Sequence, residues 1–214
     1  ALAYAKTRDA KYLTPVLAGL SAVATGNLES GARALALGRE LLSVVLTADT
    51  IGLAEIDPAL DAKFRTKLAY LLTFKTTSGP ANLIACSLDR PNNWGAHSTA
   101  SWIAAALYLG DMAGVDKAAK VTKGWLGDRS AYAGFTYGGL GWQSDPNNPV
   151  GVLGVNAEIQ GHNLSGAQPE ELRRGGSFQW PPPKNDAYMY SYESMQGRLA
   201  AAYMLSRLPE YADV

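Results

Sequence analysis

The first half of the chain repeats a helical pattern of apolar positions with short polar breaks. Apolar side chains recur every three to five positions in the first segment, the spacing of one buried stripe on an α-helix. They are Tyr12, Leu13, Val16, Leu17, Leu20 and Val23. A break at 25–27 leads to a second helical stretch that ends near Asp49, and Asp57-Pro58 supplies an N-cap and a first-turn proline for a third helix. The pattern predicts antiparallel helical hairpins.

Two more helices are expected after a polar connection at 87–93. The first is alanine-rich, covers 96–109 and ends at Gly110, and the second covers 115–126. From 127 to 184 the residues Gly, Pro, Asn and aromatics dominate, which predicts a long ordered loop region with short strands at most. Long loops of this kind on a helical scaffold usually carry binding or catalysis.

The last segment predicts an amphipathic helix over 190–208. Four apolar residues have the spacing of its inward face: Met195, Leu199, Tyr203 and Leu208. The fold class expected from the whole pattern is all-α, in a single domain over 1–214. Residues 1–10 already read as the middle of a helix, so we expect a leader and one or two helices upstream of this sequence.

Composition excludes several classes of function. Lys plus Arg equals Asp plus Glu at 19 each, so no net charge attracts nucleic acid, an anionic membrane or an acidic polymer over long range, and an anion needs a local site. Cys86 is the only cysteine and is expected in the core. No apolar run reaches the ~20 residues of a membrane span. No spacing of Cys and His predicts a metal, and no cofactor motif is present, so we expect no cofactor. We also expect a monomer.

The segment 92–97 combines two amides, an indole and an imidazole at the start of a helix. Helix N-termini attract anions, and the Asn93 amide and the His97 imidazole, about one turn apart, are suited to a carboxylate. The alternative is structural: Asn92 or Asn93 caps the helix and His97 is a buried histidine with satisfied hydrogen bonds. Gly38-Arg39 and Asp49 interrupt apolar helical stretches upstream and could line the groove, but we interpret them as structural pairs and leave them out of the site.

A second segment, Ser-Gly-Ala-Gln-Pro-Glu-Glu-Leu-Arg-Arg-Gly at 165–175, precedes three tyrosines at the start of the last helix. A tyrosine can donate a proton to a leaving oxygen or, with a lowered pKa, accept one, and Arg174 could bind a carboxylate in bidentate fashion. The alternative is that Tyr190 and Tyr192 only pack the core.

Together these segments carry a family resemblance. The run from Asn92 to Asp111 resembles the Asn-Asn-His helix motif of the alginate lyase superfamily, with Asn93 at the position that neutralises the substrate carboxylate. The Pro-Glu-Glu-Leu-Arg-Arg-Gly run followed by Tyr-Ser-Tyr is similar to the family's second motif. By that match Tyr190, or alternatively Tyr192, is the catalytic tyrosine, and Arg174 or Arg173 the arginine.

The resemblance implies an incomplete (α/α) toroid that cleaves a uronic-acid polysaccharide, such as alginate or glucuronan, by β-elimination. It also implies a secreted or periplasmic enzyme. The chain departs from the family at Trp94, where the family has histidine, so His97 and His162 remain alternative catalytic bases. The residues expected to bind the sugar chain are Trp94, Trp142, Gln143, Arg173 and Trp180.

Two other functions stay open at this point. A glycoside hydrolase on a helical toroid needs two carboxylates at a fixed separation. The available acids are Glu158, Asp145, Asp186 and Glu193. The other function is a carbohydrate-binding or structural domain without catalysis. Convergence of Asn93, Arg174 and Tyr190 in space would favour an enzyme over such a domain.

Overall fold

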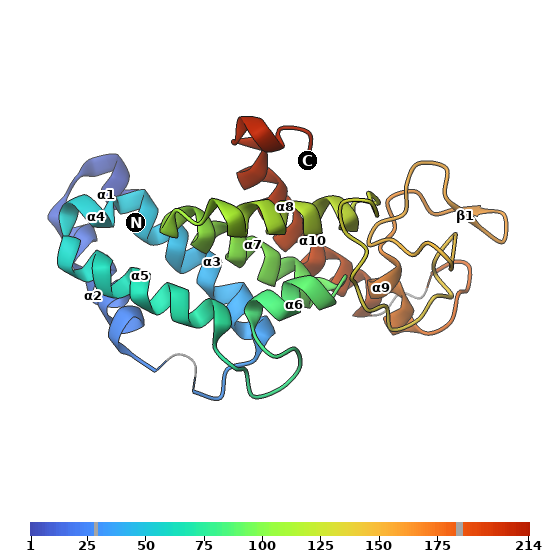
Figure 1. The fold of residues 1–214 in the computed structure, drawn as a ribbon, viewed down its shortest axis with the longest axis horizontal. Helices are drawn as coiled ribbons and strands as arrows, with labels where there is room; N and C mark the ends of the chain where they lie inside the picture. Colours follow the sequence, from blue (N-terminus) through green and yellow to red (C-terminus); the bar gives the residue numbers. More distant parts are fainter. Residues whose placement is uncertain (28–29, 183–185) are drawn as a thin grey trace.

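A computed structural model describes residues 1–27, 30–182 and 186–214 (Figure 1). Of residues 186 and 187 it describes the main chain only. The chain is mostly helical, as the sequence predicts. The helices are α1 (Leu2–Thr7), α2 (Ala10–Thr25), α3 (Ala34–Ile51), α4 (Leu53–Ile56), α5 (Pro58–Thr73), α6 (Leu83–Asp89), α7 (Asn93–Leu109), α8 (Met112–Trp125), α9 (Pro169–Leu172) and α10 (Asp186–Ser206). Two 3₁₀ turns, η1 (Arg173–Gly175) and η2 (Pro209–Tyr211), follow α9 and α10.

Helix α7 forms the centre of the helical part, and 13 of its 17 residues are buried. Its many Ala, Ser and Thr residues let neighbouring helices come close, and the hydroxyl groups of Thr99 and Ser101 have partners inside the protein. Ser101 Oγ donates to the Gly38 carbonyl of α3 at 2.7 Å, and Thr99 lies 2.8 Å from the Ser87 hydroxyl of α6. The alanine-rich composition therefore reflects a helix that is covered on almost every side.

Three helices, α3, α7 and α10, run side by side in the same direction. Gly38 lies against the α7 backbone at His97 and Ser98, and further along both helices Val45 and Ala104 line one hollow. Gly197 of α10 lies against Ala96, and Met204 reaches the same hollow as Ala104. The start of α8 lies near Trp102 and its end near Pro91, so α8 returns antiparallel to α7. The N-termini of three parallel helices thus point to one end of the helical part.

Several sequence predictions about helix ends are confirmed. Asp57 caps α5 by accepting from the Leu60 amide at 2.9 Å, Pro58 is the first helical residue, and Gly110 ends α7 with a left-handed backbone. Cys86 is buried. The predicted connection at 87–93 is shorter, because α6 continues to Asp89.

The predicted inward face of the last helix is wrong at three of its four positions; the fourth, Leu208, follows the helix and is partly buried against the core. Leu199 and Tyr203 are 60% and 67% exposed, and Met195 is also exposed. The helix covers 186–206 rather than 190–208, and the residues that it buries are mostly small or polar, with Leu205 as a large apolar one: Ser194, Gly197, Arg198, Ala201 and Leu205. The cause is that α10 meets the α7 backbone through Gly197, so the contact needs small side chains rather than large apolar ones.

The loop region forms a separate lobe at one end of the helices (Figure 1). It contains one antiparallel hairpin of β1 (Glu158–Ile159) and β2 (His162–Asn163), then α9 and η1. Its core is Trp142 with Leu172 and Phe178, and the Trp142 indole donates to the Gly176 carbonyl at 2.9 Å. The last two residues of the predicted loop, 183 and 184, lie outside the described residues. Among the described residues, none of the helices has the length and apolar character needed to cross a membrane.

Candidate anion-binding site

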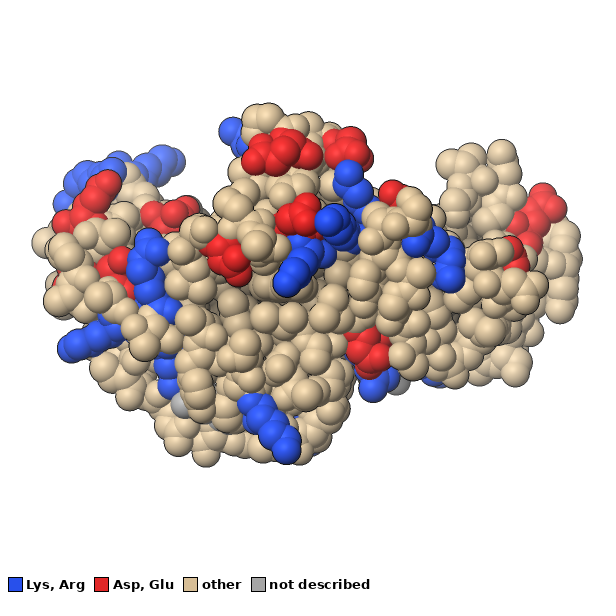
Figure 2. All heavy atoms as spheres, viewed as in Figure 1, with Lys and Arg blue, Asp and Glu red and all other residues tan. Residues whose placement is uncertain are grey.

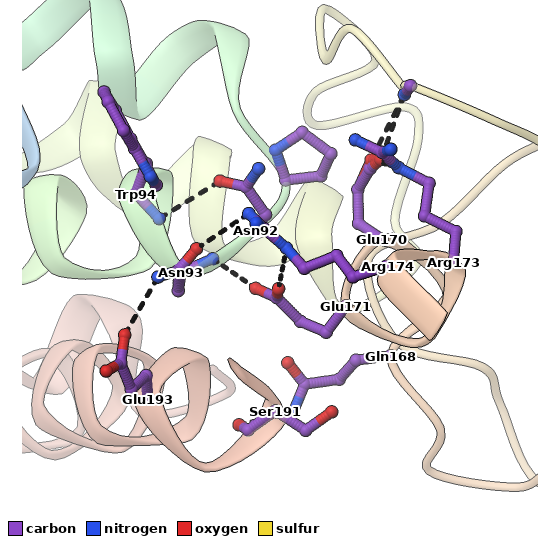
Figure 3. A network of polar contacts seen from close by, with 12 residues as sticks. Asn92, Asn93, Trp94, Gln168, Glu170, Glu171, Arg173, Arg174, Ser191 and Glu193 are labelled. Atoms are coloured by element: carbon purple, nitrogen blue, oxygen red, sulfur yellow. Dashed lines mark hydrogen bonds and ion pairs between the residues drawn. The ribbon is translucent and has the colours of Figure 1, made fainter. Parts of the chain in front are cut away.

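The start of α7 holds Asn93 in a network of polar contacts (Figure 3). Asn92 caps the helix, because its side-chain oxygen accepts from the Trp94 amide at 3.1 Å. Asn92 therefore has the structural role of a helix cap. Asn93 is fully buried, and its main-chain N–H donates to Glu171 of α9. Its side-chain Nδ2 donates to Glu193 of α10 at 3.0 Å, and its Oδ1 accepts from Arg174 at 3.3 Å. Asn93 therefore joins three elements that are far apart in sequence.

Two buried glutamates of α9 fix two arginines. Glu170 and Glu171 are only 2% and 1% exposed. Glu170 accepts from Arg173 and from the Gly138 main chain at 3.0 Å, and Glu171 accepts from Arg174 Nε at 3.1 Å. The sequence analysis did not single out either glutamate, although the segment 170–174 contains two overlapping Glu-x-x-Arg motifs. Each arginine is thus oriented by a carboxylate one turn earlier.

Tyr190 completes the group of residues that the sequence singled out. It is half-buried on α10, and the Arg174 guanidinium carbon lies 4.1 Å from the centroid of its ring. Asn93, Arg174 and Tyr190 therefore meet in space, with Arg174 between the other two.

A hollow of about 290 Å³ opens beside this group. Its lining is Gly79, Pro80, Arg90, Asn92, Trp94, Arg173 and Arg174. The lining contains three arginines and one indole, and it lies at the N-terminal end of α7, where the helix dipole favours anions. Trp94 is held against Gly79, where an added Cβ would lie 2.7 Å from its ring. The volume is near the lower end of the ~300–1,000 Å³ range of ligand sites, which suits a single sugar ring.

A second group of charged residues lies on the other side of Asn93. Arg39 of α3 donates to the same Glu193 oxygen that accepts from Asn93. His97, one turn after Asn93, is buried, and its Nε2 has no hydrogen-bond partner among the described residues. Burial, and next the charge of Arg39, lower the pKa of His97, which favours a neutral imidazole. The structural pair expected for Arg39 is confirmed, but it is made with a residue of the site.

Of the predicted site residues, Trp94, Arg173 and Arg174 line the hollow, whereas Asn93, His97, Tyr190 and the residues below do not. Tyr192 is 74% exposed on α10. His162 lies on the hairpin and stacks on Trp180, with ring centroids 4.5 Å apart and planes 10° apart. Trp142 is buried in the core of the lobe, and Gln143 is buried with its amide bonded to the Val150 main chain at 2.9 and 3.1 Å. Trp142 and Gln143 are therefore placed to stabilise the lobe rather than to contact a sugar.

Buried charge surrounds Glu171. Burial raises its pKa to about 7, although Arg174 and the Asn93 N–H oppose the shift. The Arg198 guanidinium of α10 lies 4.6 Å from the centroid of the Trp125 ring, and its nitrogens have no hydrogen-bond partner among the described residues. Burial lowers the pKa of Arg198 to about 9, and the charge of Glu171 opposes this shift most strongly. Glu171 and Arg198 are therefore a buried acid and a buried base of opposite charge.

The raised pKa of Glu171 predicts how stability changes with pH. Between 4.5, its ordinary pKa, and about 7, the folded protein keeps a proton that the unfolded chain has lost. The free energy of unfolding should therefore fall as pH rises through this interval, with a contribution approaching ~1.4 kcal/mol per pH unit, and level off above it. Urea denaturation from pH 4.5 to 8 measures this slope. Glu171→Gln should flatten it and the exposed Glu158→Gln should not, and equal slopes in all three proteins would contradict the assignment.

Comparison with known proteins gives no relative for this chain: no family model, no curated protein and no solved structure matches it. Among the described residues no group of three or more His, Cys, Asp or Glu could hold a metal ion. On the face shown in Figure 2, basic and acidic side chains alternate over the helices, and neither sign dominates. The arginines of the hollow are therefore a local feature on a surface of mixed charge.

Proposed function

We propose that this protein is a polysaccharide lyase that cleaves a uronic-acid polymer by β-elimination. The observation that carries the proposal is the meeting of Asn93, Arg174 and Tyr190 beside a hollow lined by three arginines and Trp94. A uronate offers this site a carboxylate for the guanidinium groups and a sugar ring for the indole. Such polymers occur outside the cytoplasm, so a secreted or periplasmic location belongs to the same proposal.

In β-elimination the proton on C5 of the uronate is removed, a double bond forms between C4 and C5, and the bond from C4 to the leaving O4 breaks. Negative charge builds up on the carboxylate as the C5 proton leaves. Guanidinium donors stabilise that charge more in the transition state than in the ground state, which is the condition for acceleration. Arg174 has this role, with Arg173 and Arg90 adding positive charge around the hollow.

Tyr190 is assigned the proton transfers. Its ring lies against Arg174, which lines the hollow, and is partly open to solvent. Protonation of O4 by its hydroxyl completes departure of the leaving group, and as a tyrosinate it accepts the C5 proton from the same face. His97 is the base for a substrate whose C5 proton faces the other side of Asn93. His162 is less suited, because its ring stacks on Trp180 in the hairpin.

The arrangement of the helices supports the incomplete (α/α) toroid that the family resemblance implies. We interpret the parallel helices α3, α7 and α10 as an inner layer, and the antiparallel α8 as part of an outer layer. Inner helices of one direction that alternate with returning outer helices form an arc of an (α/α) toroid. In such an arc the site lies at the N-terminal ends of the inner helices.

The hydrolase alternative has less support from the described residues. Glu170 and Glu171 are buried and bound to arginines, and Glu193 is bound to Asn93 and Arg39. Asp145 accepts bonds within its own turn, and the side chain of Asp186 lies outside the described part of the chain. Two free carboxylates that face each other across the hollow are therefore not found among the described side chains.

The proposal is tested by ultraviolet absorbance during incubation with alginate, glucuronan and other polyuronates, with a neutral glucan as control. Elimination creates an unsaturated uronate that absorbs, while hydrolysis creates reducing ends without the chromophore. Absorbance that rises with a polyuronate and stays flat with the glucan is the expected result. Reducing ends without absorbance would replace the lyase by a hydrolase, and neither signal on any polymer would favour a binding domain.

A further inference from the structure

The carboxylate of Glu193 lies in a position that is built to hold a carboxylate. Its Oε2 accepts from the Asn93 side-chain amide at 3.0 Å and from the Arg39 guanidinium (Figure 3 shows the Asn93 contact). An amide and a guanidinium are also the donors that carboxylate neutralisation in the proposed reaction requires. One of the two N–H groups of Asn93 is therefore already used by a carboxylate of the protein itself.

Glu193 differs from the other acids of the site in its exposure. Glu170 and Glu171 are buried, and each orients an arginine. The side chains of Glu193 and Arg39 are instead 36% and 39% exposed. An ion pair with this exposure contributes little to stability because water screens it and solvates both partners when it opens. The ion pair with Arg39 therefore does little to hold Glu193 in place, and departure of Glu193 frees the Asn93 amide for another acceptor.

The residues around Glu193 form a second position beside the arginine-lined hollow. Arg39 comes from α3, Glu193 from α10, and Asn93 and His97 from the same face of α7. The positive charge of Arg39 and the negative charge of Glu193 both act on the buried His97 imidazole, so the three lie close together. Asn93 separates this position from Arg174, to which it is bonded through its oxygen.

We propose that Arg39 and Asn93 form a second carboxylate-binding position, which Glu193 occupies in the free protein and from which a uronate carboxylate displaces it. Arg39 is then a substrate-binding residue, and Glu193 sets the affinity by competing with the substrate. The inference rests on the proposed function for the identity of the ligand as a uronate. Binding of a carboxylate at this position does not require catalysis.

The experiment measures binding of glucuronate by protein-detected NMR titration, because this monosaccharide has no glycosidic bond to cleave. Glu193→Ala removes the competing carboxylate and should tighten glucuronate binding by about three- to tenfold. Glu158→Ala removes the same charge from the exposed hairpin and should leave the affinity unchanged. Glucose is the neutral control ligand, and neither substitution should tighten its binding relative to the unsubstituted protein.

Arg39→Met tests the guanidinium. The double variant Arg39→Met with Glu193→Ala should lose the gain seen with Glu193→Ala alone. A gain that survives in the double variant, a gain of equal size in Glu158→Ala, or no gain in Glu193→Ala would each overturn the proposal. Its failure is separate from failure of the proposed function, which is judged by the chromophore released from polymers by the unsubstituted protein.

Discussion

Replacing Tyr190 with phenylalanine is expected to lower kcat/KM for cleavage of a uronate polymer by about 10²- to 10⁴-fold, the usual contribution of a general acid or base. The substitution removes one hydroxyl oxygen and keeps the ring that lies against Arg174. Folding should therefore be unaffected, and circular dichroism with thermal melting checks this. The rate is measured as absorbance of the unsaturated product.

Tyr192→Phe is the matched control, because Tyr192 lies two residues further along the same helix and is largely exposed. It should retain activity within about twofold, since Tyr192 is 74% exposed and does not line the arginine-lined hollow. Loss of activity in Tyr192→Phe with full activity in Tyr190→Phe would reverse the assignment that the resemblance left open between the two tyrosines. Equal activity in both variants would remove tyrosine from the proton transfers.

The helical part of the fold was predictable from sequence because its signals are local. A cap such as Asp57, a first-turn proline such as Pro58 and a terminal glycine such as Gly110 act within one turn of the helix, so each marks a boundary without knowledge of the rest. Local signals carry no information on which elements pack together, so the sequence could not show that Asn93, Arg174 and Tyr190 lie close to one another. The sequence places them on three elements, and only packing brings the elements together.

The face of α10 was mispredicted for a physical reason. Apolar periodicity identifies a buried stripe when a helix packs with large side chains. Helix α10 packs on the α7 backbone through Gly197, so most of its buried residues are small or polar and include Ser194 and Arg198. The large apolar residues Leu199 and Tyr203 lie on the other side and are exposed.

The parts of the site that were missed are pairs of charges. Glu171 looks like an ordinary surface residue in a sequence, because charged side chains are rarely buried, and for Arg39 a structural pair was expected but its partner was not. Their role appears only with their partners, which are Arg174 for one and Glu193 for the other. Trp142 shows the opposite case: an aromatic residue in a polar loop suggests a sugar platform, but here it supplies the core of a lobe that has few other apolar side chains.

The close approach of α10 and α7 positions the site, and Gly197→Ala should disrupt it. A Cβ at Gly197 would lie 2.5 Å from the Ala96 carbonyl carbon and 2.7 Å from the His97 amide nitrogen. Both are backbone atoms of a buried helix and cannot move aside, so α10 must shift outward. We expect a loss of about 3 kcal/mol in the free energy of unfolding, the upper end for overpacking, and a melting temperature lower by roughly 6–12 °C.

Gly19→Ala is the matched control, since Gly19 is also inside a helix but an added Cβ there would meet no atom within 4 Å. Alanine in an exposed helix interior is favoured over glycine, so this variant should be more stable by about 0.5–1 kcal/mol. Glu193 precedes Gly197 by one turn on α10, so an outward shift should also weaken its contact with Asn93. Gly197→Ala should consequently lose lyase activity even below its melting temperature, whereas Gly19→Ala should keep it. If Gly197→Ala melted at the temperature of the unsubstituted protein and kept its activity, α10 would not be held against α7 as the structure describes, and the position assigned to Glu193 would have to be abandoned with it.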